Sequence, residues 1–253
     1  MLELSRTQVS LLVRAFVGGF ALIAILWGCW ALPLFWNQGF DESVARGIIS
    51  GRAFRPEILS QLKSDLDAIE QSPFCRASAT RSAAIIRLRI AEQTLSVGKP
   101  ETIDQEFDAL RSALVTTLSC SPADPFSWLA LFWLSNNQIG FKSENLQYLR
   151  LSYELGPSEG WIALKRNHIA FSVFEALDPA LARTAIREFI QILNTGLYME
   201  AVEIFTGPAW RVRDQILPLL TEVPIRNREI FADALRNRGS EVIVPGVSDR
   251  RHP

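Results

Sequence analysis

The sequence predicts an all-α protein: an N-terminal transmembrane helix followed by an α-α superhelix of helix pairs. Two observations lead to this prediction. Apolar residues recur at intervals of three and four through most of the chain, which is the period of a helix with one buried face. Short connections rich in Gly, Pro, Ser and Asp separate these stretches, and none of the stretches shows the alternation of a strand ladder.

The clearest helix pair occupies residues 124–157. Asp124 can accept a hydrogen bond from a first-turn N–H, and Pro125 suits the first helical position, so a helix is expected to begin there. Gly140 should end it. Ser143 can cap a second helix, which ends before Pro157.

The same periodicity predicts the other helices. They are expected over residues 41–50, 56–71, 78–97, 102–118, 158–174, 178–193, 198–205, 208–220 and 225–238. Residues 241–253 should form an extended C-terminal tail, and the apolar triplet 242–244 within it is expected to dock on the domain.

The N-terminal region predicts a single membrane span at residues 15–36. These 22 residues carry no charge and as a helix would reach roughly 33 Å, enough for a bilayer core of about 30 Å. Arg14 precedes the span, and Trp30 and Trp36 mark its far end, where indole rings favour the interface. Bulky residues through Trp36 argue against a cleaved signal peptide.

The basic N-terminus predicts that the chain crosses the membrane with its N-terminus in the cytoplasm. Residues 1–14 form a cytoplasmic tail, 15–36 the transmembrane helix, 37–240 a periplasmic all-α domain and 241–253 the extended tail.

The three cysteines divide between these regions. Cys29 lies in the predicted span, whereas Cys75 and Cys120 follow helix ends outside it. In an oxidising compartment this pair favours a disulfide; the alternative is two unrelated core thiols.

Composition and motifs argue against several functional classes. A net charge of −1 is not that of a nucleic-acid-binding protein. Only two His are present, without the spacings of a zinc or Ser-His-Asp site, and no Gly-rich phosphate loop occurs outside the span. We therefore expect no catalytic residue, cofactor or metal, and a protein that is not an enzyme.

Aromatic and Arg side chains on the predicted helices are the candidates for an interaction surface. Indole rings stack on sugars, and guanidinium groups pair with carboxylates; packing in the core is the alternative. The candidates are Trp133, Arg150, Arg166, Trp210, Arg211 and Arg213. The expected partners are other membrane or periplasmic proteins, a polysaccharide and the lipid bilayer, with no nucleic acid.

The unit at 124–157 resembles a tetratricopeptide repeat. The matching residues are Asp124, Pro125, Trp128, Leu131, Ser152 and Pro157. The resemblance implies that the superhelix is built of tetratricopeptide-like helix pairs.

The order of features along the chain is also similar to that of single-span proteins of bacterial exopolysaccharide and O-antigen biosynthesis clusters. These features are the anchor, Phe74-Cys75, residues 84–88, 125–128 and 156–161, and Val244-Pro245-Gly246. The resemblance implies a single-pass protein of a bacterial inner membrane that acts as a non-catalytic scaffold in surface-polysaccharide biosynthesis or export. The alternatives are a polysaccharide-processing enzyme and an accessory transmembrane subunit of a transporter or energy-transducing complex.

Overall fold

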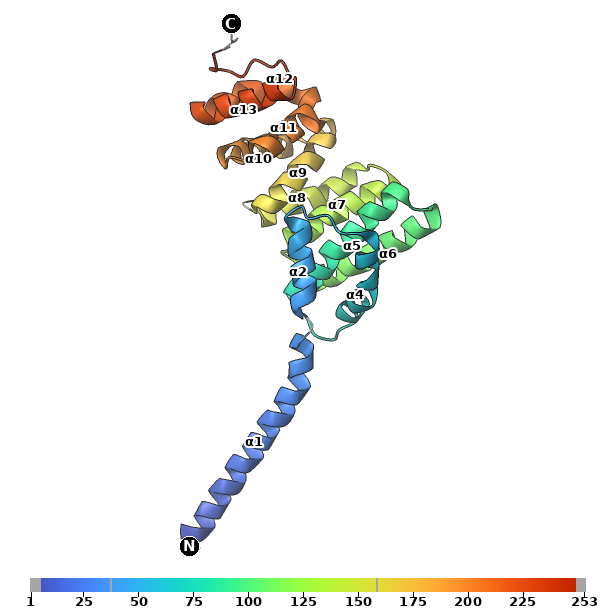
Figure 1. Ribbon diagram of the computed structural model, residues 1–253, viewed down its shortest axis with the longest axis vertical. Coiled ribbons are helices and arrows are strands. Elements are labelled where there is room, and N and C mark those ends of the chain that lie inside the picture. The colour runs from blue at the N-terminus through green and yellow to red at the C-terminus, as the bar shows by residue number, and fades with distance from the viewer. Residues whose placement is uncertain (1–5, 37, 158, 249–253) are drawn as a thin grey trace. The chain divides into compact units, whose positions relative to one another are not determined.

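The protein is built of helices and their connecting segments in the part of the chain that its computed structural model describes. The backbone is described for residues 6–36, 38–157 and 159–248, and the side chains for 13–29, 41–157 and 159–248. Every regular element in these ranges is an α-helix or a 3-10 helix, which confirms the all-α class. The chain divides into two compact units, Met1–Arg55 and Pro56–Pro253. Figure 1 shows the helices of each.

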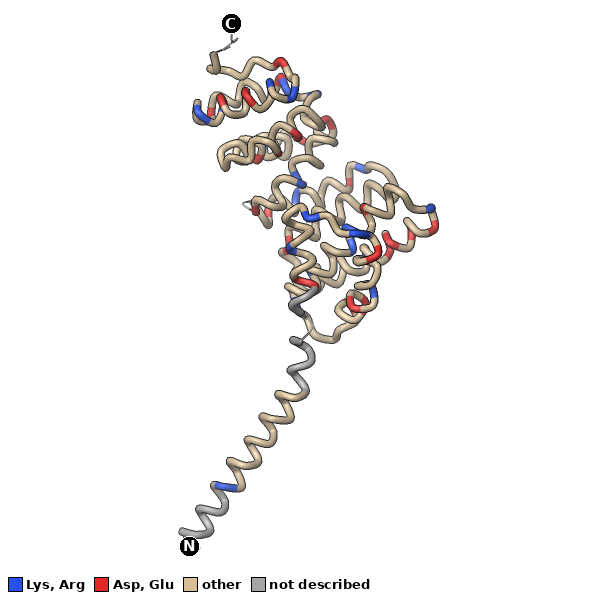
Figure 2. Tube along the Cα trace, viewed as in Figure 1, with Lys and Arg blue, Asp and Glu red and all other residues tan. Residues whose placement is uncertain are grey.

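The first unit contains α1 (Arg6–Trp36) and α2 (Gln38–Ile49). Along α1 the described side chains between residues 13 and 29 are exposed apart from the half-exposed Gly28. Figure 2 shows no charged residue in this part of α1 after Arg14. Among the described residues, no helix combines the length and the apolarity needed to cross a membrane. The span predicted for 15–36 is not confirmed and stays a prediction.

The second unit is a series of helices joined by short connections. The α-helices are α3 (Pro56–Gln61), α4 (Lys63–Glu70), α5 (Ala77–Val97), α6 (Pro100–Cys120), α7 (Pro125–Ile139), α8 (Leu146–Leu155), α9 (Gly160–Ser172), α10 (Pro179–Asn194), α11 (Tyr198–Thr206), α12 (Arg213–Ile216) and α13 (Ile225–Asn237). The 3-10 helices are Ser143–Asn145, Phe174–Ala176, Pro208–Val212 and Leu217–Glu222.

Consecutive helices pack as pairs: α5 contacts α6, α7 contacts α8, and α9 contacts α10. The first helices of successive pairs also touch, since α7 contacts both α5 and α9, and α9 contacts α11. Helix pairs are therefore present as expected, whereas the tetratricopeptide-like superhelix stays a prediction.

Two expected helices differ in the structure. The helix expected over 56–71 is divided into α3 and α4. The one expected over 208–220 consists mostly of 3-10 turns around the short α12. Pro218 has no N–H to donate within this second segment, which removes a bond that a continuous α-helix would need.

The two Asp-Pro starts are confirmed. The Asp124 carboxylate accepts a hydrogen bond from the Ser127 N–H at 3.0 Å and caps α7. The Asp178 carboxylate accepts from the N–H groups of Ala180 and Leu181 at 3.0 and 3.1 Å and caps α10. Both helices begin at the following Pro, because a missing N–H is harmless in the first turn.

A disulfide joins Cys75 to Cys120, with their Cα atoms 5.3 Å apart. Cys75 lies just before α5 and Cys120 ends α6, so the bond closes the open end of this helix pair. Cys29 is a free, exposed thiol on α1.

The C-terminal helices share an aromatic core into which the tail docks. Phe205 and Phe231 meet edge to face, with ring centroids 5.5 Å apart, and both are fully buried. Val244 is 2% exposed in the same core, as expected of the apolar triplet, whereas Ile243 is 84% exposed. An Arg228 guanidinium N–H donates to the Pro245 carbonyl and holds the extended segment against α13.

Candidate functional site

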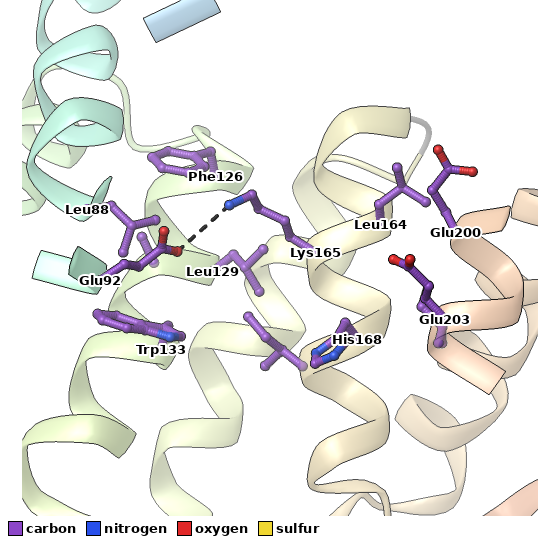
Figure 3. A pocket seen from close by; sticks show the side chains of 13 residues that line it. Leu88, Glu92, Phe126, Leu129, Trp133, Leu164, Lys165, His168, Glu200 and Glu203 are labelled. Atoms are coloured by element: carbon purple, nitrogen blue, oxygen red, sulfur yellow. Dashed lines mark ion pairs between the residues drawn. The ribbon is translucent and has the colours of Figure 1, made fainter. Parts of the chain in front are cut away.

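The most prominent candidate site is a groove of about 350 Å³ formed by α5, α7, α9 and α11 (Figure 3). We call it the α5–α11 groove. The second helix of each pair, α6, α8 or α10, contributes no lining residue among those that the structure describes. The groove therefore runs across successive helix pairs and uses one helix from each.

The floor of the groove is apolar. Phe126 and Leu129 of α7 are 2% and 3% exposed and form its base. Trp133, one turn further along α7, is half-buried and packs edge-on against Phe107 with ring centroids 5.9 Å apart. Leu164 of α9 adds a further half-buried side chain. Such a surface gains free energy when a partner removes it from water.

The rim carries charged side chains. Lys165 on α9 forms an ion pair with Glu92 on α5, with Nζ and Oε1 3.8 Å apart. Glu92 also pairs with Arg89 at 3.1 Å. On α11, Glu203 pairs with Arg238 at 2.8 Å. The neighbouring Glu200 has no ion pair within the described residues and is half-exposed.

The two ends of the groove therefore differ in electrostatic character. At the α5 end, two cations, Lys165 and Arg89, pair with the single carboxylate of Glu92, which leaves a net positive charge. At the α11 end, Glu200 and Glu203 face the groove (Figure 3), and Arg238 pairs with Glu203. His168 lies between the two ends, exposed on α9. The α11 end thus presents excess negative charge.

Arg166 does not reach this groove because it lies on the opposite face of α9. Leu164, Lys165 and His168 share one side of the helix, whereas Arg166 and Asn167 point toward α10. The Arg166 side chain is fully buried and pairs with Glu188 at 2.5 Å. The prediction that Arg166 belongs to an interaction surface is therefore wrong, because a buried carboxylate on the neighbouring helix holds it inside.

This buried cluster is fully connected around the guanidinium group. Arg166 donates to the Ser152 and Gly156 carbonyls at 2.5 and 2.9 Å, and its guanidinium carbon lies 4.3 Å from the centre of the Tyr153 ring. Burial raises the pKa of Glu188, and hydrogen bonds from Arg166 only partly offset this effect. Burial, with a smaller contribution from the Glu188 charge, raises the pKa of Tyr153 well above its ordinary value. The cluster joins α8, α9 and α10 and has a structural role.

The remaining Trp and Arg candidates lie at different places. Trp133 lines the α5–α11 groove. Arg150 is exposed and pairs with Asp178 at 2.5 Å. Trp210, 38% exposed, stacks under the Arg213 guanidinium at 4.7 Å. Arg211 lines a second cavity of about 270 Å³ together with residues 171–176. The structure therefore does not bring these candidates into one site.

The membrane candidates lie in the first unit. Arg14 is exposed on α1, and the side chains of Trp30 and Trp36 lie outside the described residues.

Sequence reasoning missed the polar residues of the groove: Glu92, Lys165, His168, Glu200 and Glu203. Each looks in the sequence like an ordinary solvated helix position. These residues line one groove only because helices that are far apart in the chain pack together. The sole sequence signal for the groove is the period of the apolar residues on α7 and α9.

No group of three or more His, Cys, Asp or Glu in the described part of the chain is placed to hold a metal ion. Comparison of the chain with protein-family models, with curated proteins and with solved structures finds no match.

Proposed function

We propose that this protein is a non-catalytic interaction subunit that binds partner proteins in the α5–α11 groove. The supporting observation is that successive helix pairs each contribute one helix to a single apolar surface. A surface built across several helix pairs is suited to an extended protein segment, as in other helical arrays. Trp133 is its natural anchor, because half-buried indole rings contribute strongly to protein interfaces.

We also propose that α1 anchors the protein to a bacterial inner membrane. The support is the uncharged stretch 15–36 together with the exposure of the apolar side chains of α1, such as Phe16 at 77% and Trp27 at 68%. A helix that is apolar on all sides is stable only if protein or lipid covers it.

The proposed compartment for the second unit is the periplasm, with the N-terminus in the cytoplasm. The disulfide between Cys75 and Cys120 supports this placement, since such bonds persist in oxidising compartments. The proposed role in surface-polysaccharide biosynthesis or export rests on the resemblance of the sequence features described above.

Affinity purification of the full chain from detergent extracts, with quantitative mass spectrometry, tests the interaction role. Trp133→Ala removes the largest apolar side chain of the groove, and Trp210→Ala is the matched control outside it. We expect a stoichiometric partner with the native chain and with Trp210→Ala, reduced at least tenfold with Trp133→Ala. A chain that purifies alone, or equal recovery with both variants, would contradict the proposal. Circular dichroism of both variants checks that each is folded.

A further inference from the structure

The distribution of charge along the α5–α11 groove defines the chemistry of its occupant. The apolar floor at Leu129, Trp133 and Leu164 is flanked at the α11 end by Glu200 and Glu203. The α5 end has the opposite sign, because Lys165 and Arg89 together exceed the single negative charge of Glu92. An apolar occupant with a positive charge at one end matches this pattern.

Glu200 is the carboxylate best placed to meet that charge. It lines the groove and is half-exposed, and within the described residues no cation pairs with it. Glu203, one turn further along α11, shares its charge with Arg238 at 2.8 Å. A guanidinium or ammonium group entering beside Glu200 would therefore form a new ion pair without displacing an existing one.

The span of the groove sets the length of the occupant. Packed helices lie about 8–10 Å apart, so the three steps from α5 to α11 cover on the order of 25–30 Å. An extended chain of about eight residues has this length at roughly 3.3 Å per residue. An extended protein segment of this length can therefore contact all four helices that line the groove.

We propose that the α5–α11 groove binds an apolar segment of a partner protein, oriented by a Lys or Arg of that segment against Glu200. This inference rests on the proposed interaction role and adds the recognition chemistry. The apolar side chains of the segment cover Leu129, Trp133 and Leu164, and its cation fixes the direction in which it lies.

Selection from a phage-displayed random dodecapeptide library tests this proposal on the full chain in lipid nanodiscs. Three targets are compared: the native chain, Glu200→Lys, and Glu154→Lys as a control for charge reversal at an exposed position of α8. We expect the native and Glu154→Lys targets to enrich peptides in which Lys or Arg follows or precedes an apolar run. Glu200→Lys should instead enrich Asp or Glu at that position.

A peptide selected on the native chain is then synthesised with a fluorophore, and its dissociation constant is measured for each variant. Its dissociation constant should rise roughly two- to fivefold with Glu200→Gln, the size of effect expected for an exposed ion pair, and should not change with Glu154→Gln. Equal peptide preferences for all three targets, or the absence of any enrichment, would overturn the inference. A native partner that still co-purifies in full with Glu200→Lys would also overturn it, while leaving the interaction role intact.

Discussion

Arg166 of α9 and Glu188 of α10 form an ion pair of 2.5 Å in which the two side chains are 0% and 5% exposed. Arg166 also binds the carbonyls at the end of α8, so a single guanidinium group holds three helices together. The groove depends on this pair, because α9 can present Lys165 and His168 to α5 and α11 only while its other face is fixed against α10.

Breaking this pair should strongly destabilise the second unit. Glu188→Gln leaves the buried Arg166 without its counter-charge and is expected to lower the free energy of unfolding by about 3–5 kcal/mol. The double variant Arg166→Met with Glu188→Leu should recover much of the loss, since no buried charge remains. Urea denaturation of the full chain in detergent, followed by circular dichroism, measures both. A loss below about 1 kcal/mol for Glu188→Gln would show that the pair is not buried in solution.

Because burial raises the pKa of the Tyr153 hydroxyl, we expect the folded protein to lose stability at alkaline pH. Above a pH of about 10 the unfolded chain releases the Tyr153 proton, whereas the raised pKa lets the folded chain keep it. The unfolded state then binds fewer protons, so the free energy of unfolding falls as pH rises, by about 1.4 kcal/mol per pH unit, until the folded pKa is reached. Tyr153→Phe should remove this part of the slope between pH 10 and 11. Identical slopes for both proteins would contradict the burial of the hydroxyl.

The two Asp caps should differ in strength although their sequence motifs are alike. Asp178→Ala removes an exposed cap and should lower the free energy of unfolding by about 1 kcal/mol. Both carboxylates also pair with an Arg, but Asp124 is fully buried, so Asp124→Ala should lower it by about 2–3 kcal/mol. Thermal unfolding of both variants gives the comparison. Equal losses would mean that burial adds nothing to the Asp124 cap.

The disulfide should be a principal stabilising element of the α5–α6 pair. The double variant Cys75→Ser with Cys120→Ser releases a loop closed over a separation of 45 residues. On the chain-entropy model this lowers the free energy of unfolding by about 4 kcal/mol. Cys29→Ser, which removes the free thiol, is the control and should have no effect. Labelling of the native chain with a maleimide before and after reduction should reveal two additional thiols.

The proposed topology can be tested with a reporter enzyme that is active only after export. Fused after residue 253, it should be active in intact cells, because the model of a periplasmic second unit places the C-terminus outside the cytoplasm. A fusion after residue 14 should be inactive. If only a reporter that works in the cytosol were active at the C-terminus, the proposed periplasmic location and the proposed polysaccharide role would both be wrong.

The starts of individual helices and the all-α fold class were predictable from the sequence. The starts of α7 and α10 follow from Asp124 and Asp178, since an N-cap carboxylate followed by Pro specifies a helix start within a few residues. The all-α class follows in the same way from the apolar period. These signals need no knowledge of how distant segments pack.

The site was not predictable in the same way. Arg166 and Lys165 are neighbours with similar charge, yet one is buried and the other lines the groove. What separates them is Glu188, 22 residues away on α10, whose position beside α9 depends on helix packing. Glu200 and Glu203 likewise become part of a site only because α11 contacts α9.

Site-specific photo-crosslinking in living cells tests directly whether the groove holds a partner protein. A photoreactive amino acid replaces His168, exposed in the groove, or Val115, which is 55% exposed on α6 outside it. We expect a discrete crosslinked protein from position 168 that is absent from position 115. Crosslinks of equal yield from both positions, or none from position 168, would contradict it.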